Sequence, residues 1–169
     1  MKKWLIPLLA AMLVLFALGA AAQEQEMLAV GDELCGFKVT QIVHNQQYDL
    51  DFVHMEHEKT GALLVYIPCE DTERSFTVSF RTPAESDKGI PHVYEHSTLG
   101  GSEKYPDPSL FFSMINQTYN TYLNAGTYIS NTTFDSASLS EEQLLAFADY
   151  TMAGLYHPLI MTDERSMMR

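Results

Sequence analysis

The sequence predicts an α+β fold, in which an antiparallel sheet has helices packed on one face. In the first half of the 169-residue chain, short segments rich in β-branched and aromatic side chains are separated by polar breaks. In the second half, segments with helical spacing stand between further strand-like segments. With 46% hydrophobic and 19% charged residues, the composition is that of a globular protein, which excludes disordered, collagen-like and coiled-coil chains.

Residues 1–22 are expected to form a bacterial-type signal peptide. Lys2 and Lys3 precede an apolar run, and Ala20 and Ala22 offer the small-residue pattern that signal peptidase reads, with cleavage before Gln23. The alternative is an uncleaved anchor, since the apolar run could just span a bilayer. The first interpretation predicts a periplasmic or secreted protein without stable membrane insertion after cleavage, and it leaves residues 23–169 as one domain.

The net charge of −12 limits the partners of the chain. The positive residues form no runs, so a nucleic-acid-binding surface is not expected. An acidic surface attracts cationic partners over long range, which favours basic peptides among peptide partners.

Two cysteines, Cys35 and Cys69, are too few for a disulfide scaffold. In an oxidising compartment they could pair with each other. Burial as two separate apolar side chains is the other interpretation.

The strand-like segments of the first half are residues 37–43, 48–55, 62–67 and 75–80, with a hairpin turn at residues 59–61. Residues 90–99 are then expected to be a helix, because Pro91 lies in its first turn and Gly100 and Gly101 follow its end. A short helix at 108–115 and two strands at 121–128 and 132–138 come next.

The last expected element is a helix that begins after Ser140. The segment Ser140 to Gln143 has the form of a capping box. One helical stripe then carries four apolar residues, and the helix is expected to end near Pro158. The four are Leu144, Ala148, Met152 and Leu155.

The chemical motif is H-x-x-E-H, formed by His92, Glu95 and His96. Residues four apart share one face of a helix, so both imidazoles can converge on one ion, and zinc suits them. Glu95 projects from an adjacent position, close enough to take a proton from water. The other interpretation is two exposed histidines beside a glutamate on an ordinary amphipathic helix.

Several spaced segments resemble the pitrilysin/insulinase family of zinc peptidases, and most closely its presequence-protease branch. They are residues 79–83, 89–102 and 104–106, then 120–128, where N-T-Y-L-N-A-G-T-Y matches N-T-x-L-N-A-x-T-Y, and upstream the hairpin at 57–62. The resemblance covers roughly residues 35–160, and it implies the metallohydrolase fold of these peptidases, a sheet covered by helices.

The resemblance also implies roles for single residues. His92 and His96 match the two histidine ligands of zinc, and Glu95 matches the general base. Asn124 and Ala125 match the edge strand against which an extended peptide is laid. The chain is thus expected to be a zinc endopeptidase acting on unstructured peptides.

The family's third ligand is a glutamate on a later helix, and its spacing would place it beyond Arg169. Asp163 and Glu164 are the last acids of the chain, and they are expected to be solvated charges at a helix start. Residues 23–169 are therefore expected to be the amino-terminal part of a catalytic domain, truncated at its carboxyl end.

Two alternative functions remain. The chain could be a non-catalytic peptide-binding fragment with an incomplete metal site. A small zinc lyase of quorum-signal synthesis has a similar motif and length, although the export signal and Lys104-Tyr105-Pro106 argue against it.

His54 and His57 form a second histidine pair, which is expected to belong to a polar hairpin end, because residues three apart on a strand face opposite sides.

Overall fold

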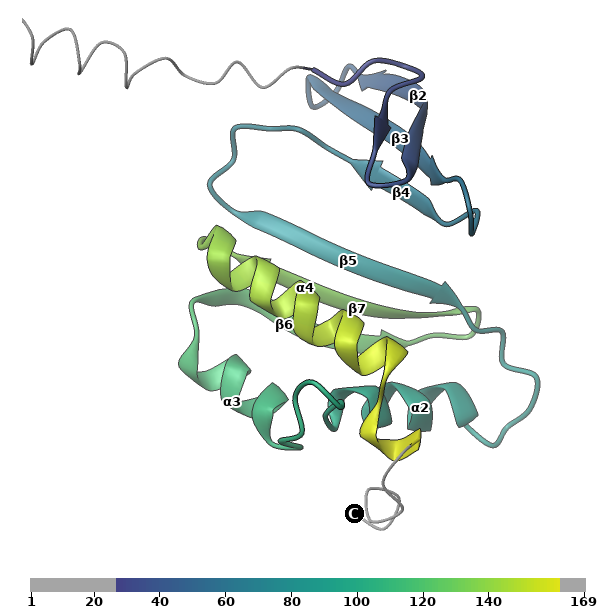
Figure 1. Ribbon diagram of the computed structural model, residues 1–169, viewed down its shortest axis with the longest axis vertical. Helices are drawn as coiled ribbons and strands as arrows, with labels where there is room; N and C mark the ends of the chain where they lie inside the picture. Colours follow the sequence, from purple (N-terminus) through teal and green to yellow (C-terminus); the bar gives the residue numbers. More distant parts are fainter. Residues whose placement is uncertain (1–26, 162–169) are drawn as a thin grey trace, which may run out of the picture. The chain divides into compact units, whose positions relative to one another are not determined.

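The structure of the protein is a computed structural model that describes residues 27–161. The chain divides into two compact units between Cys69 and Glu70 (Figure 1). The predictions for residues 1–22, Asp163 and Glu164 lie outside the described residues.

The first unit is an antiparallel sheet of four strands in the order β1-β2-β3-β4. These are β1 (Glu33–Leu34), β2 (Phe37–Asn45), β3 (Leu50–His57) and β4 (Leu63–Tyr66). The three strands predicted here and the turn before Gly61 are confirmed, and β1 is an addition. Val39, Val53 and Met55 form the core of the sheet, because alternate residues of β2 and β3 point to its buried face.

The turn between β1 and β2 consists of Cys35 and Gly36, which have φ angles of 52° and 82°. A two-residue hairpin loop with both φ angles positive has the twist that the flanking strands require. Cys35 and Cys69 are both free and exposed. Neither the disulfide nor the pair of buried cysteines that the sequence allowed is therefore found.

The second unit contains a three-stranded antiparallel sheet in the order β5-β7-β6. Its elements are β5 (Arg74–Arg81), α2 (Ile90–Leu99), α3 (Leu110–Gln117), β6 (Asn120–Thr127), β7 (Asn131–Ser138), α4 (Glu141–Tyr156) and the 3-10 helix η1 (Leu159–Met161). The predicted bounds of α2 are confirmed, and α3 begins two residues later than predicted. Because β7 is central, β5 and β6 form the two edges of this sheet.

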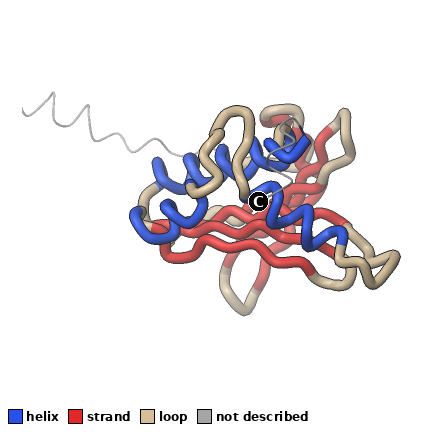
Figure 2. Tube along the Cα trace, turned by 90° about the horizontal axis from the view of Figure 1, so that it is seen from below, coloured by secondary structure: helices blue, strands red, loops and turns tan. Residues whose placement is uncertain are grey.

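One face of the β5-β7-β6 sheet is covered by helices (Figures 1 and 2). On β7, Thr132, Phe134 and Ser136 are buried, whereas Thr133 and Asp135 between them are half-buried. Helices α2 and α4 both pack against β7 and against each other. The predicted α+β class with helices on one face is confirmed for this unit.

Helix α4 begins at the predicted N-cap, Ser140, but only one of the two hydrogen bonds of a capping box is formed. Ser140 Oγ accepts a hydrogen bond from the backbone N–H of Gln143 at 3.4 Å. The side chain of Gln143 does not return to Ser140, because its Oε1 accepts from the backbone N–H of Tyr119 at 2.7 Å. The cap thus also fixes the chain just before β6.

The buried stripe of α4 differs from the predicted one. Of the predicted residues only Leu144 is buried, and the stripe continues through Phe147, Thr151 and Gly154. The physical reason is the contact with α2: a Cβ atom built on Gly154 would lie 2.4 Å from the carbonyl oxygen of Thr98. The helices approach so closely that only a glycine fits, a requirement that apolar periodicity does not reveal.

Tyr150, one turn before Gly154, links α4 to α2 by a hydrogen bond. Its hydroxyl donates to the carbonyl oxygen of Leu99, the last residue of α2, at 2.7 Å. This satisfies one of the carbonyl groups that a helix end leaves without a partner. Burial, with a smaller contribution from Asp107, raises the pKa of Tyr150 to about 12.

Within residues 27–161, no helix combines the length and the apolar character that crossing a membrane requires.

We expect Gly154→Ala to lower the free energy of unfolding. In a helix without contacts the change would stabilise the protein by about 1 kcal/mol. Here the new methyl group meets the backbone of Thr98, and overpacking of this kind costs about 1–3 kcal/mol. Urea denaturation of the full chain measures the sign, with Ala146→Gly at an exposed position of α4 as the calibration of helix propensity. A higher midpoint for Gly154→Ala would contradict the close approach.

We expect the stability of the protein to fall as the pH rises from about 10 to about 12. In the unfolded chain a tyrosine loses its proton near pH 10, whereas Tyr150 keeps it until about pH 12 in the folded protein. Deprotonation therefore favours the unfolded state within this interval. Urea midpoints measured between pH 8 and pH 11.5 should fall less steeply for Tyr150→Phe than for the parent, and equal slopes would show that Tyr150 makes no contribution.

Candidate functional site

Helix α2 carries the histidine motif, and both of its ends are determined locally. Gly89 precedes the helix with a φ angle of 66°, and Pro91 lies in the first turn. The left-handed conformation at Gly89 suits glycine, and proline loses no hydrogen bond in a first turn. Gly100 ends the helix, and its N–H donates to the carbonyl oxygen of Ser97 at 3.2 Å.

His92 and His96 lie one above the other on an exposed side of α2. Their Nε2 atoms are 3.0 Å apart, and the rings stack with centroids 4.8 Å apart and an angle of 26° between the planes. One Nε2–H group can donate to the other Nε2 only if one ring is neutral at that atom. To bind one metal ion, both rings would have to carry their hydrogen on Nδ1, which leaves the two neighbouring Nε2 atoms free as ligands.

The spacing of this pair fits half of a tetrahedral metal shell. A tetrahedral zinc ion with Zn–N bonds of about 2.05 Å holds two nitrogen ligands about 3.3 Å apart, a little more than the 3.0 Å between the two Nε2 atoms. Among the described residues, no group of three His, Cys, Asp or Glu side chains could hold a metal ion. Within residues 27–161, the two histidine nitrogens therefore have no third side chain beside them that would complete a metal site.

Glu95, unlike the two histidines, is buried, with 5% of its surface exposed. Adjacent helical positions differ by about 100°, so a residue beside His96 points away from it, toward the sheet. Its Oε2 atom accepts a hydrogen bond from Thr127 Oγ1 of β6 at 2.6 Å. Thr127 cannot be recognised as a partner of Glu95 from the sequence, because the contact joins residues far apart in the chain.

The predicted substrate residues Asn124 and Ala125 lie on β6, an edge strand that packs against α2. Their register partners are Asp135 and Phe134 of β7. Because side chains alternate along a strand, Ala125 faces the helices with Phe134, and Asn124 faces the other side. There the amide of Asn124 donates to the hydroxyl of Tyr122 at 3.4 Å, and no contact with the histidines is formed.

The second histidine pair belongs to the hairpin of β3 and β4. His57 Nδ1 lies 2.8 Å from Thr60 Oγ1, and its ring packs on Phe37 with centroids 4.9 Å apart. These contacts stabilise a turn, and they give His57 a structural role.

Comparisons with known proteins add to this geometry. The chain matches no family profile. It is 34% identical over 134 residues to the mitochondrial presequence protease of Gibberella zeae, covering 79% of this chain and 13% of that protein. It is 38% identical over 140 residues to the one of Schizosaccharomyces pombe, covering 82% of this chain and 14% of that protein.

A bacterial relative and a solved structure agree with these matches. Protein HypA of Clostridium perfringens is 34% identical over 134 residues, with 79% of this chain and 14% of that protein covered. The crystal structure of pitrilysin has the same fold over 77% of this chain and 14% of its own, with a TM-score of 0.65 and 18% identity. The chain belongs to the pitrilysin/insulinase family. It corresponds to an amino-terminal portion of these metallopeptidases and spans only 13–14% of the length of the relatives named here.

Family membership corrects one prediction. Export to the periplasm or the exterior is wrong, because the relatives from both fungi are named as mitochondrial proteins. The physical reason is that lysines followed by an apolar run are not specific to one compartment, so such a segment alone does not identify a destination.

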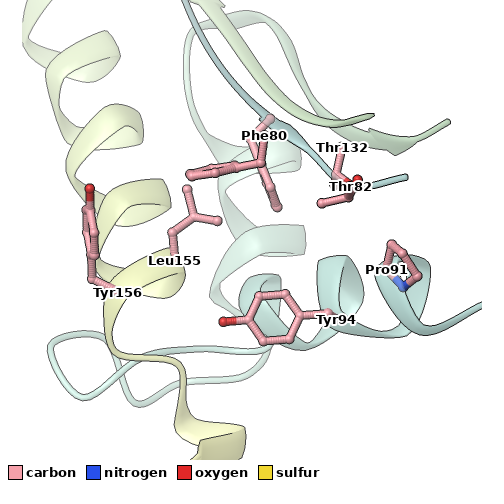
Figure 3. Close-up of a pocket in the computed structure, with 8 residues that line it drawn as sticks. Phe80, Thr82, Pro91, Tyr94, Thr132, Leu155 and Tyr156 are labelled. Carbon is pink, nitrogen blue, oxygen red and sulfur yellow. The ribbon is translucent and has the colours of Figure 1, made fainter. Parts of the chain in front are cut away.

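A hollow of about 270 Å³ lies on the side of α2 that does not carry the two histidines. Figure 3 shows Pro91 and Tyr94 of α2 facing it, opposite Phe80 of β5, with Leu155 and Tyr156 of α4 beside it. Its lining is mostly apolar and contains neither histidine of the motif, so the hollow is separate from the proposed metal ligands.

Proposed function

We propose that this chain forms part of a zinc-dependent endopeptidase domain that hydrolyses unstructured peptides. The observation that carries the proposal is the arrangement on α2, where two Nε2 atoms lie 3.0 Å apart on an exposed side and the adjacent residue, Glu95, is a buried carboxylate. The relatives that share this segment are named as proteases, which supports the same chemistry here. Residues 23–169 are proposed as the amino-terminal part of the catalytic domain.

In this proposal His92 and His96 hold the metal, and the third ligand comes from outside residues 27–161. When bound, zinc supplies Lewis acidity toward water and the substrate carbonyl. Two neutral imidazoles would not reduce the positive charge of the ion, whereas the glutamate expected as the third ligand would reduce it in part.

Glu95 is proposed as the general base. Its carboxylate takes a proton from water as the water oxygen adds to the peptide carbonyl carbon. The same proton then passes to the leaving amine nitrogen as the C–N bond breaks. The carboxylate is regenerated in each cycle, and one water molecule is consumed for each peptide bond.

The free edge of β6 is proposed to bind the substrate. An extended peptide can add to an edge strand through main-chain hydrogen bonds, with little demand on its sequence. Asn124 and Ala125 are proposed to contact the peptide from opposite faces of this strand. Because the chain carries a net charge of −12, basic peptides are the proposed preference, and the preference should weaken as salt is added.

We expect His92→Ala to abolish zinc binding at this site. The change removes one of two described ligands, so the affinity should fall by more than the roughly 10- to 100-fold that loss of an outer-shell partner costs. Calorimetric titration of the full chain with Zn²⁺ measures the affinity. His54→Ala on β3 is the matched control and should bind as the parent does. Equal affinities for the parent and His92→Ala would contradict the assignment of the ligands.

We expect Glu95→Gln to keep the zinc affinity of the parent and to lose peptide cleavage. The amide fills the same space but cannot accept the proton, and general bases contribute about 10²- to 10⁴-fold to such rates. Cleavage of a fluorogenic basic peptide measures the loss.

A second candidate function, a peptide-binding module without turnover, is favoured by the lack of a third ligand in the described residues. Peptide binding that persists in EDTA, with no cleavage by the parent, would support the module and contradict the peptidase.

A further inference from the structure

The two oxygens of the Glu95 carboxylate have different surroundings. Oε2 accepts the hydroxyl hydrogen of Thr127 at 2.6 Å, a short distance typical of a hydrogen bond to a charged acceptor. Oε1 receives no hydrogen bond from any residue between 27 and 161. The side chain is therefore fixed through one oxygen, and the other remains available to a reactant.

Thr127 is held in place by the strand that carries it. It is the last residue of β6, and its register partner on β7 is Thr132. Both side chains face the helices, because Thr132 lies on the buried side of β7 with 4% of its surface exposed. The hydroxyl of Thr127 has a single hydrogen, so donating it to Glu95 leaves its oxygen as an acceptor only.

A second layer of hydroxyl groups lies behind Thr127. Thr132 Oγ1 is 3.5 Å from Thr127 Oγ1 and 2.8 Å from Thr82 Oγ1. Figure 3 shows Thr82 and Thr132 next to each other at the edge of the apolar hollow. The contact at 3.5 Å is long for hydroxyl groups, so the main partner of Thr132 is Thr82, and its support of Thr127 is weaker.

We propose that Thr127 is a positioning residue for Glu95: its hydroxyl holds Oε2 so that Oε1 is the oxygen that accepts the proton of the attacking water. The inference rests on the function proposed above for Glu95. A carboxylate that must present one oxygen to water gains from losing its rotational freedom before the reaction. Thr132 contributes less, because its stronger hydrogen bond is to Thr82.

The kinetic test compares Thr127→Val, Thr127→Ser and a matched control. Valine has the shape of threonine without the hydroxyl, so kcat for peptide cleavage should fall roughly tenfold, a part of the 10²- to 10⁴-fold effect of a general base, with KM unchanged. Serine restores the hydroxyl and should restore kcat. The control is Thr77→Val, because Thr77 Oγ1 also donates to a carboxylate oxygen, Asp135 Oδ1, at 2.8 Å, on the other face of the sheet. Parent-like kcat in Thr127→Val, or a serine variant as impaired as the valine variant, would overturn the proposal.

A spectroscopic test separates this inference from the peptidase proposal. In the metal-free full chain with labelled threonine, the hydroxyl proton of Thr127 should exchange slowly with water and resonate downfield. Glu95→Gln should move this resonance upfield, because a neutral acceptor binds the hydrogen more weakly, and it should leave Thr77 unchanged. If the parent cleaves no peptide, the peptidase proposal is refuted. The resonance of Thr127 then still tests whether Thr127 positions Glu95, because it does not depend on activity. If the hydroxyl proton of Thr127 exchanges rapidly and its chemical shift is unchanged in Glu95→Gln, the proposal that Thr127 positions Glu95 is overturned.

Discussion

The close approach of α4 to α2 is the constraint on which the second unit depends. At Gly154 the backbone of α4 comes so near the carbonyl group of Thr98 that a side chain has no room. Tyr150 adds a hydrogen bond to the end of α2, and Asp149 accepts hydrogen bonds from Lys104 and Tyr105 in the loop that follows it. Helix α2 is thereby fixed along its carboxyl-terminal half, where Glu95 and His96 lie.

This fixed helix presents different chemistry on two of its sides. His92 and His96 are exposed, and Glu95 between them in sequence is buried against Thr127. A buried carboxylate needs a hydrogen-bond donor, and losing one costs about 1.5–3 kcal/mol. Thr127 of the sheet can donate to Glu95 only while α2 is fixed in its present orientation about its own axis. The packing of α4 and the hydrogen bond of Glu95 therefore depend on the same orientation of α2.

The sequence predicts the local features of this arrangement well. Pro91 and Gly100 determine the bounds of α2, and alternating residues identify the strands, because these signals act over a few residues. The spacing of His92 and His96 likewise implies their convergence. The buried stripe of α4, the second partner of Gln143 and the contact between Thr127 and Glu95 are not predictable in this way. Each depends on a neighbour brought close by tertiary structure, and a glycine such as Gly154 has no side chain to reveal its contact.

The geometry separates two requirements of a metallopeptidase site. Within the described residues, Glu95 is oriented by the packing of α2 against α4 and by its hydrogen bond to Thr127 of β6. A complete metal shell requires a further ligand, since the described residues supply only the two histidines. Among the described residues, the position of the proposed base thus depends on contacts of the second unit alone, whereas the proposed metal site also needs a ligand from outside residues 27–161. A portion that spans 13–14% of the relatives named here can therefore orient the proposed base and carry two of the proposed metal ligands.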